Sequence, residues 1–283
     1  MRTGGVFAAL LSASALWLAG ALAFAQVPST ADSISASSEL AQPLVSSDAD
    51  SPEVWLVTVE PGQAYWQRFG HNTLLMRSRS GRAISFNFGY FDFDQQDFLL
   101  RFLRGRMLYM AVALDAERDI GGYLEEGRRV WMQRLALDPM QTQRLETHLR
   151  KHVLAENREY RYDYFTSNCS SKLRDALDLA LNGEFKRVSE HRSHGYSYRH
   201  FARAHAASLP WLYLGIDLGL GQPSDQVLSL WDEAFIPGEL MRRVRELKDA
   251  NGNPLVVEEQ VLSLIHISEP TRLRRTSYAV FCL

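Results

Sequence analysis

The sequence has few cysteines, almost no net charge and a single long hydrophobic run. Its only cysteines are Cys169 and Cys282 among 283 residues. Lysine and arginine total 31 against 33 aspartates and glutamates, so the formal net charge is -2. A charge this close to neutral gives no indication of nucleic-acid binding, and we expect no nucleic-acid partner.

The one hydrophobic run, residues 6–22, is typical of a signal peptide. It follows Arg2 and precedes Ala23-Phe24-Ala25, the small-x-small pattern that signal peptidase prefers. A retained membrane anchor fits less well, because the run is short and no stop-transfer flank follows it. We therefore predict a signal peptide at 1–25, cleavage before Gln26 and export to the periplasm. Residues 26–52, rich in Ser, Ala, Asp and Pro, predict a flexible linker.

The last residues resemble translated adaptor DNA. Residues 262–272, LSLIHISEPTR, are what a transposase sequencing adaptor encodes, and residues 277–283 resemble its far end. We therefore exclude 262–283 from fold reasoning and take 246–261 as the start of a missing C-terminal region. Cys282 is then set aside, so a disulfide is excluded and the single thiol of Cys169 needs another explanation.

The remaining residues, 53–245, predict one folded domain of the α+β class. Alternating or continuous apolar runs predict strands at 54–59, 73–77, 83–88, 107–114 and 129–137. Apolar spacing and caps predict helices at 95–104, 115–126, 139–154 and 172–181, with short helices near 198, 224 and 238. The pattern favours an antiparallel sheet with helices beside it.

Cys169 is the residue with the clearest chemical potential. It lies where a helix is predicted to begin, and the unpaired amides and dipole of a first helical turn favour a thiolate nucleophile. The other interpretation is a small buried apolar residue. His71 is the best candidate base for such a thiol. It lies in Phe69-Gly70-His71-Asn72, just before the strand predicted at 73–77.

Other polar clusters do not match a known site. His148 and His152 have zinc-ligand spacing but lack the HExxH glutamate, so a solvated helix surface is the better interpretation. We predict no metal and no cofactor, since there is also no G-x-S-x-G, Walker or G-x-G-x-x-G motif. Two further groups match no metal site, namely His191, His194, His200 and His205, and Asp92, Asp94 and Asp97.

Several motifs together resemble the Lnb N-terminal periplasmic domain family, over about residues 54–240. The motifs are Thr58-Val59-Glu60-Pro61-Gly62, Phe69-Gly70-His71-Asn72, Phe86-Asn87-Phe88-Gly89-Tyr90-Phe91, Gly127-Arg128, Tyr162-Asp163-Tyr164 and Asn168-Cys169-Ser170. The resemblance implies lipoprotein N-acyl transfer, with a phospholipid as acyl donor and a lipoprotein as acceptor.

The order of a histidine on a strand and a later cysteine on a helix is also similar to circularly permuted papain-like enzymes. That resemblance implies a permuted papain-like core, with an antiparallel sheet packed on the nucleophile-bearing helix and extra C-terminal helices. It implies Cys169 as nucleophile, His71 as general base and Asn87 as the residue that orients the imidazole. Tyr164, Phe91 and Tyr109 are candidate wall residues of a substrate groove, or simply core aromatics.

Two alternatives stay open at this stage. A cell-wall peptide hydrolase would use the same thiol chemistry, whereas a non-catalytic periplasmic binding or scaffolding domain would only bury Cys169. The folded part has no segment long enough to cross a membrane, so any contact with a membrane surface is expected from the missing C-terminal region. A contact between Cys169 and His71 would favour an enzyme.

Overall fold

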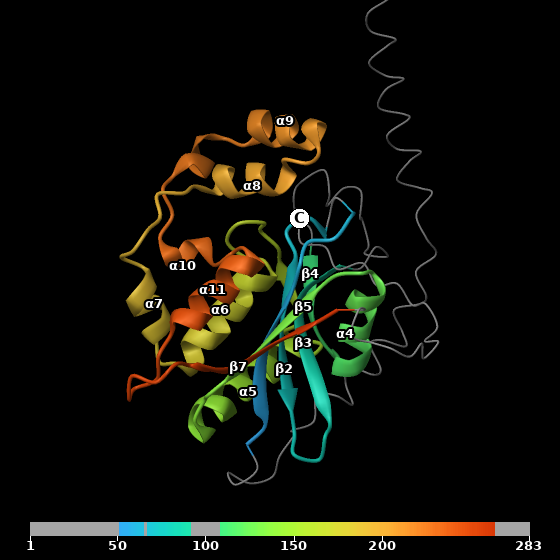
Figure 1. Cartoon of the computed structure of the whole chain (residues 1–283), viewed down its shortest axis with the longest axis vertical. Helices are drawn as coiled ribbons and strands as arrows, with labels where there is room; N and C mark the ends of the chain where they lie inside the picture. Colours follow the sequence, from blue (N-terminus) through green and yellow to red (C-terminus); the bar gives the residue numbers. More distant parts are fainter. Residues whose placement is uncertain (1–50, 65–66, 92–107, 264–283) are drawn as a thin grey trace, which may run out of the picture.

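Seven strands form one antiparallel sheet in the order β6-β4-β3-β2-β1-β5-β7 (Figure 1). This is a computed structural model, and it describes residues 51–64, 67–91 and 108–263. The strands are β1 Glu53–Val59, β2 His71–Arg77, β3 Ala83–Phe91, β4 Leu108–Asp115, β5 Val130–Leu135, β6 Glu159–Arg161 and β7 Val256–Leu262. The predicted α+β class and antiparallel sheet are confirmed.

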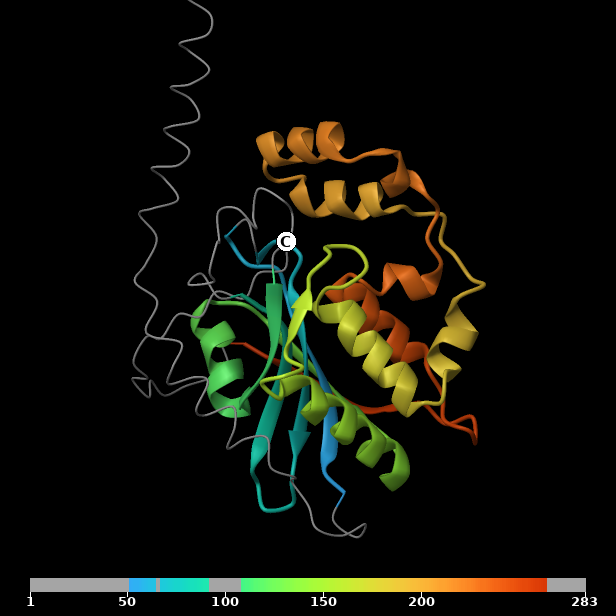
Figure 2. The ribbon, with the colours of Figure 1, turned by 180° about the vertical axis from the view of Figure 1, so that it is seen from behind.

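Helices cover both faces of the sheet. Figures 1 and 2 show α4 on one face, with α5, α6 and α11 on the other, and α8 and α9 stacked beyond one end of the strands. The helices of the described ranges are α4 Ala116–Glu125, α5 Pro139–Val153, α6 Cys169–Ala180, α7 Glu184–Ser189, α8 Tyr198–Ala206, α9 Pro210–Gly219, α10 Leu230–Glu233 and α11 Pro237–Glu246, with a short 3₁₀ turn at Gln222–Asp225.

The two-residue alternation of the strands divides the apolar side chains between two clusters. Leu74 and Phe86 belong to the cluster that includes Leu173 of α6. Leu75 lies on the opposite face, in the cluster that contains Ile120 and Tyr123 of α4. Because both faces are covered by helices, the central strands are apolar on both sides, which explains why β1 reads as a continuous hydrophobic run.

Helix caps agree with the sequence signals. The Asp138 side chain accepts from the Gln141 amide in a capping box, with Pro139 in the first turn of α5. The Asp115 side chain accepts from the Arg118 amide and begins α4. These caps begin the helices at the positions that their local sequence predicts.

Some elements differ from the prediction. Strand β2 begins at His71 rather than Thr73, so His71 is part of the sheet. Strand β6 is only three residues long, and β7 carries charged residues on a partly exposed edge, so neither has a clear apolar pattern. Strand β7 pairs with β5 within a stretch to which no element had been assigned. The helix predicted at 95–104 lies outside the described residues.

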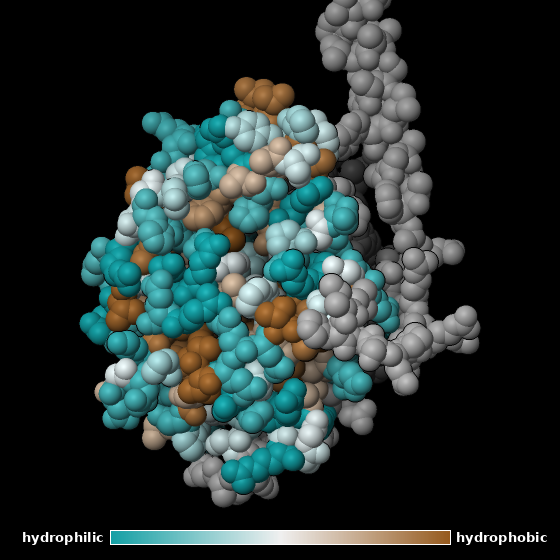
Figure 3. All heavy atoms as spheres, viewed as in Figure 1, coloured by the Kyte–Doolittle hydropathy of each residue, from teal (hydrophilic) through white to brown (hydrophobic). Residues whose placement is uncertain are grey.

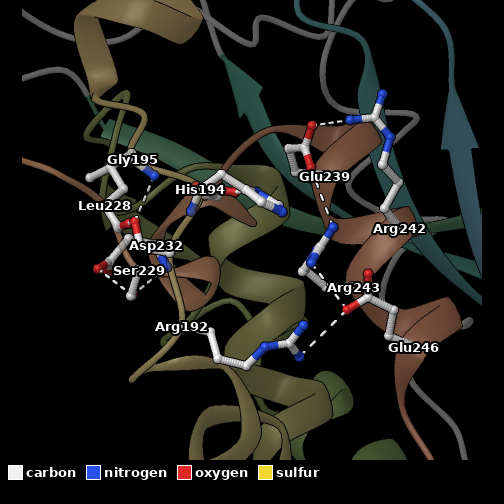
Figure 4. Close-up of polar contacts among 12 residues, drawn as sticks. Arg192, His194, Gly195, Leu228, Ser229, Asp232, Glu239, Arg242, Arg243 and Glu246 are labelled. Carbon is white, nitrogen blue, oxygen red and sulfur yellow. Dashed lines mark hydrogen bonds and ion pairs between the residues drawn. The ribbon is translucent and has the colours of Figure 1, made fainter.

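An ion network links the chain after α7 to α11 (Figure 4). The Arg243 guanidinium lies 3.0 Å from the Glu246 carboxylate and 4.0 Å from that of Glu239. Arg192, from the loop that follows α7, approaches Glu246 at 3.7 Å. Glu239 also pairs with Arg242. Arg243 and Glu239 are buried within α11, whereas the Arg192–Glu246 pair that reaches the loop is exposed and contributes little to stability.

Replacing Leu173 with alanine should destabilise the fold through a cavity between α6 and the sheet. Leu173 is fully buried, so we expect a loss of about 2–5 kcal/mol in the free energy of unfolding, measured by denaturant titration. Leu179→Ala on the same helix is the control, because Leu179 is 44% exposed and should change stability by less than about 1 kcal/mol. Equal effects of the two variants would contradict this packing.

Candidate functional site

Cys169 is the first residue of α6, where an asparagine cap fixes the helix. The Asn168 side chain accepts from the Ser171 amide at 2.8 Å, and the Ser171 hydroxyl accepts from the Asn168 amide at 2.8 Å. This reciprocal box satisfies two amides of the first turn, so the helix must begin at Cys169. The predicted placement of Cys169 at a helix start is therefore confirmed.

Asn168 also ties the helix start to two other segments. Its Nδ2 donates to the carbonyl of Tyr164 and to that of Phe235, each at 2.9 Å. Tyr164 lies in the loop before α6, and Phe235 lies between α10 and α11. The position of the Cys169 thiol is thus determined by contacts within and beyond its own helix.

His71 begins β2 directly after a glycine at a position where any side chain would be strained. Gly70 has a φ of +81°, and a Cβ there would lie 2.6 Å from the Val59 carbonyl oxygen. Both the positive φ and the missing side chain let the chain return close to β1, where His71 pairs with Val59. The glycine in the motif therefore places the imidazole at the end of the sheet.

A chain of buried hydrogen bonds runs from His71 to α4. The His71 Nε2 lies 2.9 Å from Asn87 Oδ1, and Asn87 Nδ2 donates to Asp119 Oδ2 at 2.9 Å. Since the amide nitrogen faces the carboxylate, the amide oxygen must face His71 and accept from Nε2–H. The structure thereby leaves Nδ1 as the basic nitrogen of a neutral imidazole. The expected pairing of Asn87 with His71 is present.

Cys169 and His71 interact, as an enzyme would require. Burial lowers the pKa of His71, but the charge of Cys169, hydrogen bonds with Cys169 and Asn87, and the charge of Asp119 outweigh it, so the pKa is raised above 6.5. Both side chains are almost completely buried. A thiol at a helix N-terminus, in contact with an imidazole, can form a thiolate–imidazolium pair.

Asp119 is a site residue that the sequence analysis missed. Burial raises the pKa of its carboxyl group, while hydrogen bonds from Asn87 and Ser85 and the charge of His71 oppose that rise. The signal was present in α4, where Ala116, Asp119, Ile120 and Tyr123 form one buried face. A carboxylate on an otherwise apolar helix face requires a buried partner.

A second buried polar chain, also missed, lies on the opposite face of the sheet. The Ser170 hydroxyl donates to Asn72 Oδ1 at 2.7 Å, and Asn72 Nδ2 donates to the Thr58 hydroxyl at 2.8 Å. Ser170 also lies 3.8 Å from the Cys169 sulfur. These contacts attach the first turn of α6 to β1 and β2, so the thiol cannot shift along the sheet without losing buried hydrogen bonds.

The three candidate wall aromatics lie in two separate groups. Phe91 and Tyr109 contact each other across β3 and β4 with ring centroids 5.1 Å apart, and Tyr109 stacks on Tyr162 at 4.1 Å. Tyr164 instead packs edge-on against Phe69 at 4.9 Å. The Tyr164 carbonyl accepts from Asn168, which links this residue directly to the cap that positions Cys169.

The remaining histidines of the described ranges are set apart from Cys169 and His71. Among the residues that the structure describes, no group of three His, Cys, Asp or Glu could hold a metal ion. The rings of His148 and His152 lie 4.3 Å apart, and they are half-buried rather than fully solvated as expected. Burial, followed by the charge of His152, lowers the pKa of His148 to about 4.

Residues 39–203 match the family model of the Lnb N-terminal periplasmic domain. The chain belongs to this family. The match contains Cys169, His71, Asn87 and Asp119 and ends within α8. No curated protein and no solved structure matches the chain.

The family description assigns the Lnb domain to the periplasm, in agreement with the predicted export. The predicted cleavage before Gln26 lies outside the described residues. Within the ranges that the structure describes, no helix is long and apolar enough to cross a membrane.

Removal of the Cys169 thiol should lower the pKa of His71. Nuclear magnetic resonance titration should place that pKa above 6.5 in the native protein. The Cys169→Ala variant loses two contributions that raise the pKa and keeps the burial that lowers it, so the pKa should fall. Leu179→Ala is the control and should leave the titration unchanged. An unchanged titration in Cys169→Ala would mean that the two side chains do not interact.

The same shift links folding to pH. Because the folded pKa of His71 is raised, its protonation stabilises the native state below the unfolded value of 6.5. This contribution disappears as the pH rises through the folded pKa.

Proposed function

We propose that this Lnb domain is an exported cysteine acyltransferase or hydrolase, with Cys169 as nucleophile, His71 as general base and Asn87 as the residue that orients the imidazole. The observation that carries the proposal is the continuous arrangement of thiol, imidazole, amide and carboxylate. A nucleophile in contact with a base, which is itself oriented by a third group, is the usual signature of covalent catalysis. The arrangement supports the resemblance to permuted papain-like enzymes by its geometry alone.

The first half of the reaction is acylation of the thiol. His71 Nδ1 takes the Cys169 proton, and the sulfur attacks the carbonyl carbon of an ester to form a tetrahedral intermediate. Backbone amides at the start of α6 stabilise the oxyanion, assisted by the helix dipole. The C–O bond of the ester then breaks, the leaving alkoxide takes the proton from His71, and a thioester remains on Cys169.

The second half of the reaction transfers the acyl group to an acceptor and regenerates the free thiol of Cys169. His71 removes a proton from the acceptor, an amine or water, which attacks the thioester carbonyl. The C–S bond breaks, and His71 protonates the departing thiolate. An amine acceptor gives an amide, and water gives a free acid. The resemblance to Lnb proteins favours a phospholipid donor and a lipoprotein amine, while water as acceptor or a peptide bond as donor corresponds to a hydrolase such as one acting on cell-wall peptides.

Asp119 acts as a positioning residue in this scheme. Its carboxylate accepts from Asn87 Nδ2, so Asn87 presents its oxygen to His71. The imidazole is therefore held in the tautomer whose lone pair is on Nδ1. A catalytic histidine in the other tautomer cannot act as the base, which makes this indirect contact important for the rate.

The alternative is a non-catalytic periplasmic binding or scaffolding domain. The observation that favours it is the burial of Cys169, whose side chain is 0% exposed and belongs to the main hydrophobic cluster. Cysteine is a common buried residue, and packing alone would account for it. The two functions differ in one measurable property, because only an enzyme needs Cys169 to react in the folded protein.

The decisive experiment is detection of an acyl group on Cys169. Protein incubated with phosphatidylglycerol vesicles should gain one acyl chain by intact-protein mass spectrometry, and hydroxylamine should remove it because thioesters are labile to it. We expect no adduct on Cys169→Ala and acylation slowed by at least about 100-fold in His71→Ala, since the base is lost.

The matched control is His152→Ala, which removes another half-buried histidine and should acylate at the native rate. Iodoacetamide labelling of the native protein provides a second readout that needs no substrate. If Cys169 forms no adduct and reacts with iodoacetamide only after unfolding, the enzyme proposal is wrong and the binding domain is the correct function.

Asp119→Asn should slow acylation while the protein stays folded. The amide has the shape of the carboxylate but not its charge, so Asn87 is no longer held in one orientation, and we expect a loss of about tenfold or more. Since the charge of Asp119 raises the pKa of His71, the His71 limb of the pH–rate profile should move to lower pH. Glu125→Gln, on the exposed side of α4, should change neither quantity, and a native profile in Asp119→Asn would exclude the positioning role.

A further inference from the structure

Helix α9 presents a row of large apolar side chains to solvent. Trp211, Leu214 and Leu218 are 55%, 58% and 86% exposed, and their spacing places them on one face of the helix. None of the ten residues of α9 is buried. Figure 3 shows hydrophobic residues at the end of the molecule where Figure 1 places this helix. Helices that lie in the plane of a membrane interface bury such an apolar face among the lipids.

The apolar face of α9 carries no charge of its own. Asp217 is the only charged residue between 210 and 219, and its carboxylate lies 3.5 Å from Arg203 and 3.9 Å from Arg199, both on α8. Arg203 also stacks over the Tyr213 ring at 4.8 Å. The polar side of α9 is therefore occupied by α8, and only its apolar side faces outward.

The α8–α9 pair lies over the end of the sheet that holds the site. Phe201 of α8 belongs to an aromatic cluster with Phe69, and His205 stacks on the Phe69 ring at 5.0 Å. Phe69 lies two residues before His71. Tyr164 packs against the same cluster, four residues before Asn168. Contacts from α8 thus connect the exposed helix to the segments that lead into both reactive residues.

We propose that the Trp211–Leu214–Leu218 face of α9 docks on the surface of a phospholipid bilayer. The inference rests on the proposed function, because docking would bring a lipid ester near the site. The residues that support it are different from those of the site. Residues 210–219 lie outside the 39–203 stretch that matches the Lnb family, so the family match does not account for this face.

A second protein is a poorer occupant than a lipid surface. A ten-residue helix is about 15 Å long and 10 Å wide, a footprint of roughly 150 Å². A stable protein interface buries about 800 Å² on each partner. A bilayer needs no matching surface, since a few apolar side chains with an aromatic ring can enter the interface while the helix lies in its plane. Helix α9 is far too short to span the bilayer.

Vesicle flotation tests the proposal directly. Processed protein purified from the periplasm is mixed with vesicles of phosphatidylcholine and phosphatidylglycerol and centrifuged through a density gradient. The native protein should float with the vesicles. The triple variant Trp211→Ser, Leu214→Ser and Leu218→Ser should lose at least about tenfold in bound fraction, because the apolar face is gone.

A matched triple variant controls for the removal of exposed apolar surface elsewhere. Met140→Ser, Leu179→Ser and Val257→Ser changes three residues that are 67%, 44% and 49% exposed on other elements, and it should float like the native protein. All variants should melt at the native temperature. If the native protein does not float, or if the α9 variant floats equally well, the docking proposal is wrong.

The outcome is distinguishable from failure of the proposed chemistry. Iodoacetamide labelling of Cys169 reports on the thiol without any lipid, so the α9 variant should label at the native rate. Flotation that depends on α9, together with an unreactive Cys169, would support the docking proposal and contradict the enzyme proposal. A reactive Cys169 in a protein that does not float would support the enzyme proposal and contradict the docking proposal.

Discussion

The antiparallel pairing of β2 with β3 is the constraint on which the site depends. Thr73 lies opposite Asn87 in this register, so His71 and Asn87 extend from the same face of the sheet and can share a hydrogen bond. A slip of one residue would turn Asn87 to the face of α6 and leave Asp119 without its partner. The hydrogen bond that attaches α4 to the sheet, from Asn87 to Asp119, depends on this register.

Two buried polar chains attach helices to opposite faces of the same sheet. One joins α4 to β3 and β2 through Asp119 and Asn87, and the other joins α6 to β2 and β1 through Ser170 and Asn72. Buried polar groups are costly unless every partner is present, so these chains allow only one relative placement of helix and sheet. That placement brings a thiol and an imidazole from separate elements into contact.

The parts that sequence could predict are those governed by local rules. Alternating or continuous apolar runs predicted five of the strands, and the Asp138-Pro139 signal predicted the start of α5. The helix start at Cys169 and the pairing of Asn87 with His71 were also predicted. Strand β7 was missed because an exposed edge strand needs no apolar face, and Asp119 was missed because its only distinctive property is a partner 32 residues away. The exposed face of α9 was not recognised, because Trp211, Leu214 and Leu218 are spaced three and four residues apart, as the apolar residues of a buried helix face would be.

The sequence by itself determined approximately where most of the central strands and the main helices lie, because caps, turns and apolar spacing act over a few residues. It also determined family membership, through motifs that place a histidine before a cysteine. Only the tertiary structure decided which side chains meet, that Asn87 joins His71 to Asp119 and that Trp211, Leu214 and Leu218 of α9 are exposed. The physical reason is that hydrogen bonds and burial between distant segments depend on register and packing, which no short stretch of sequence encodes.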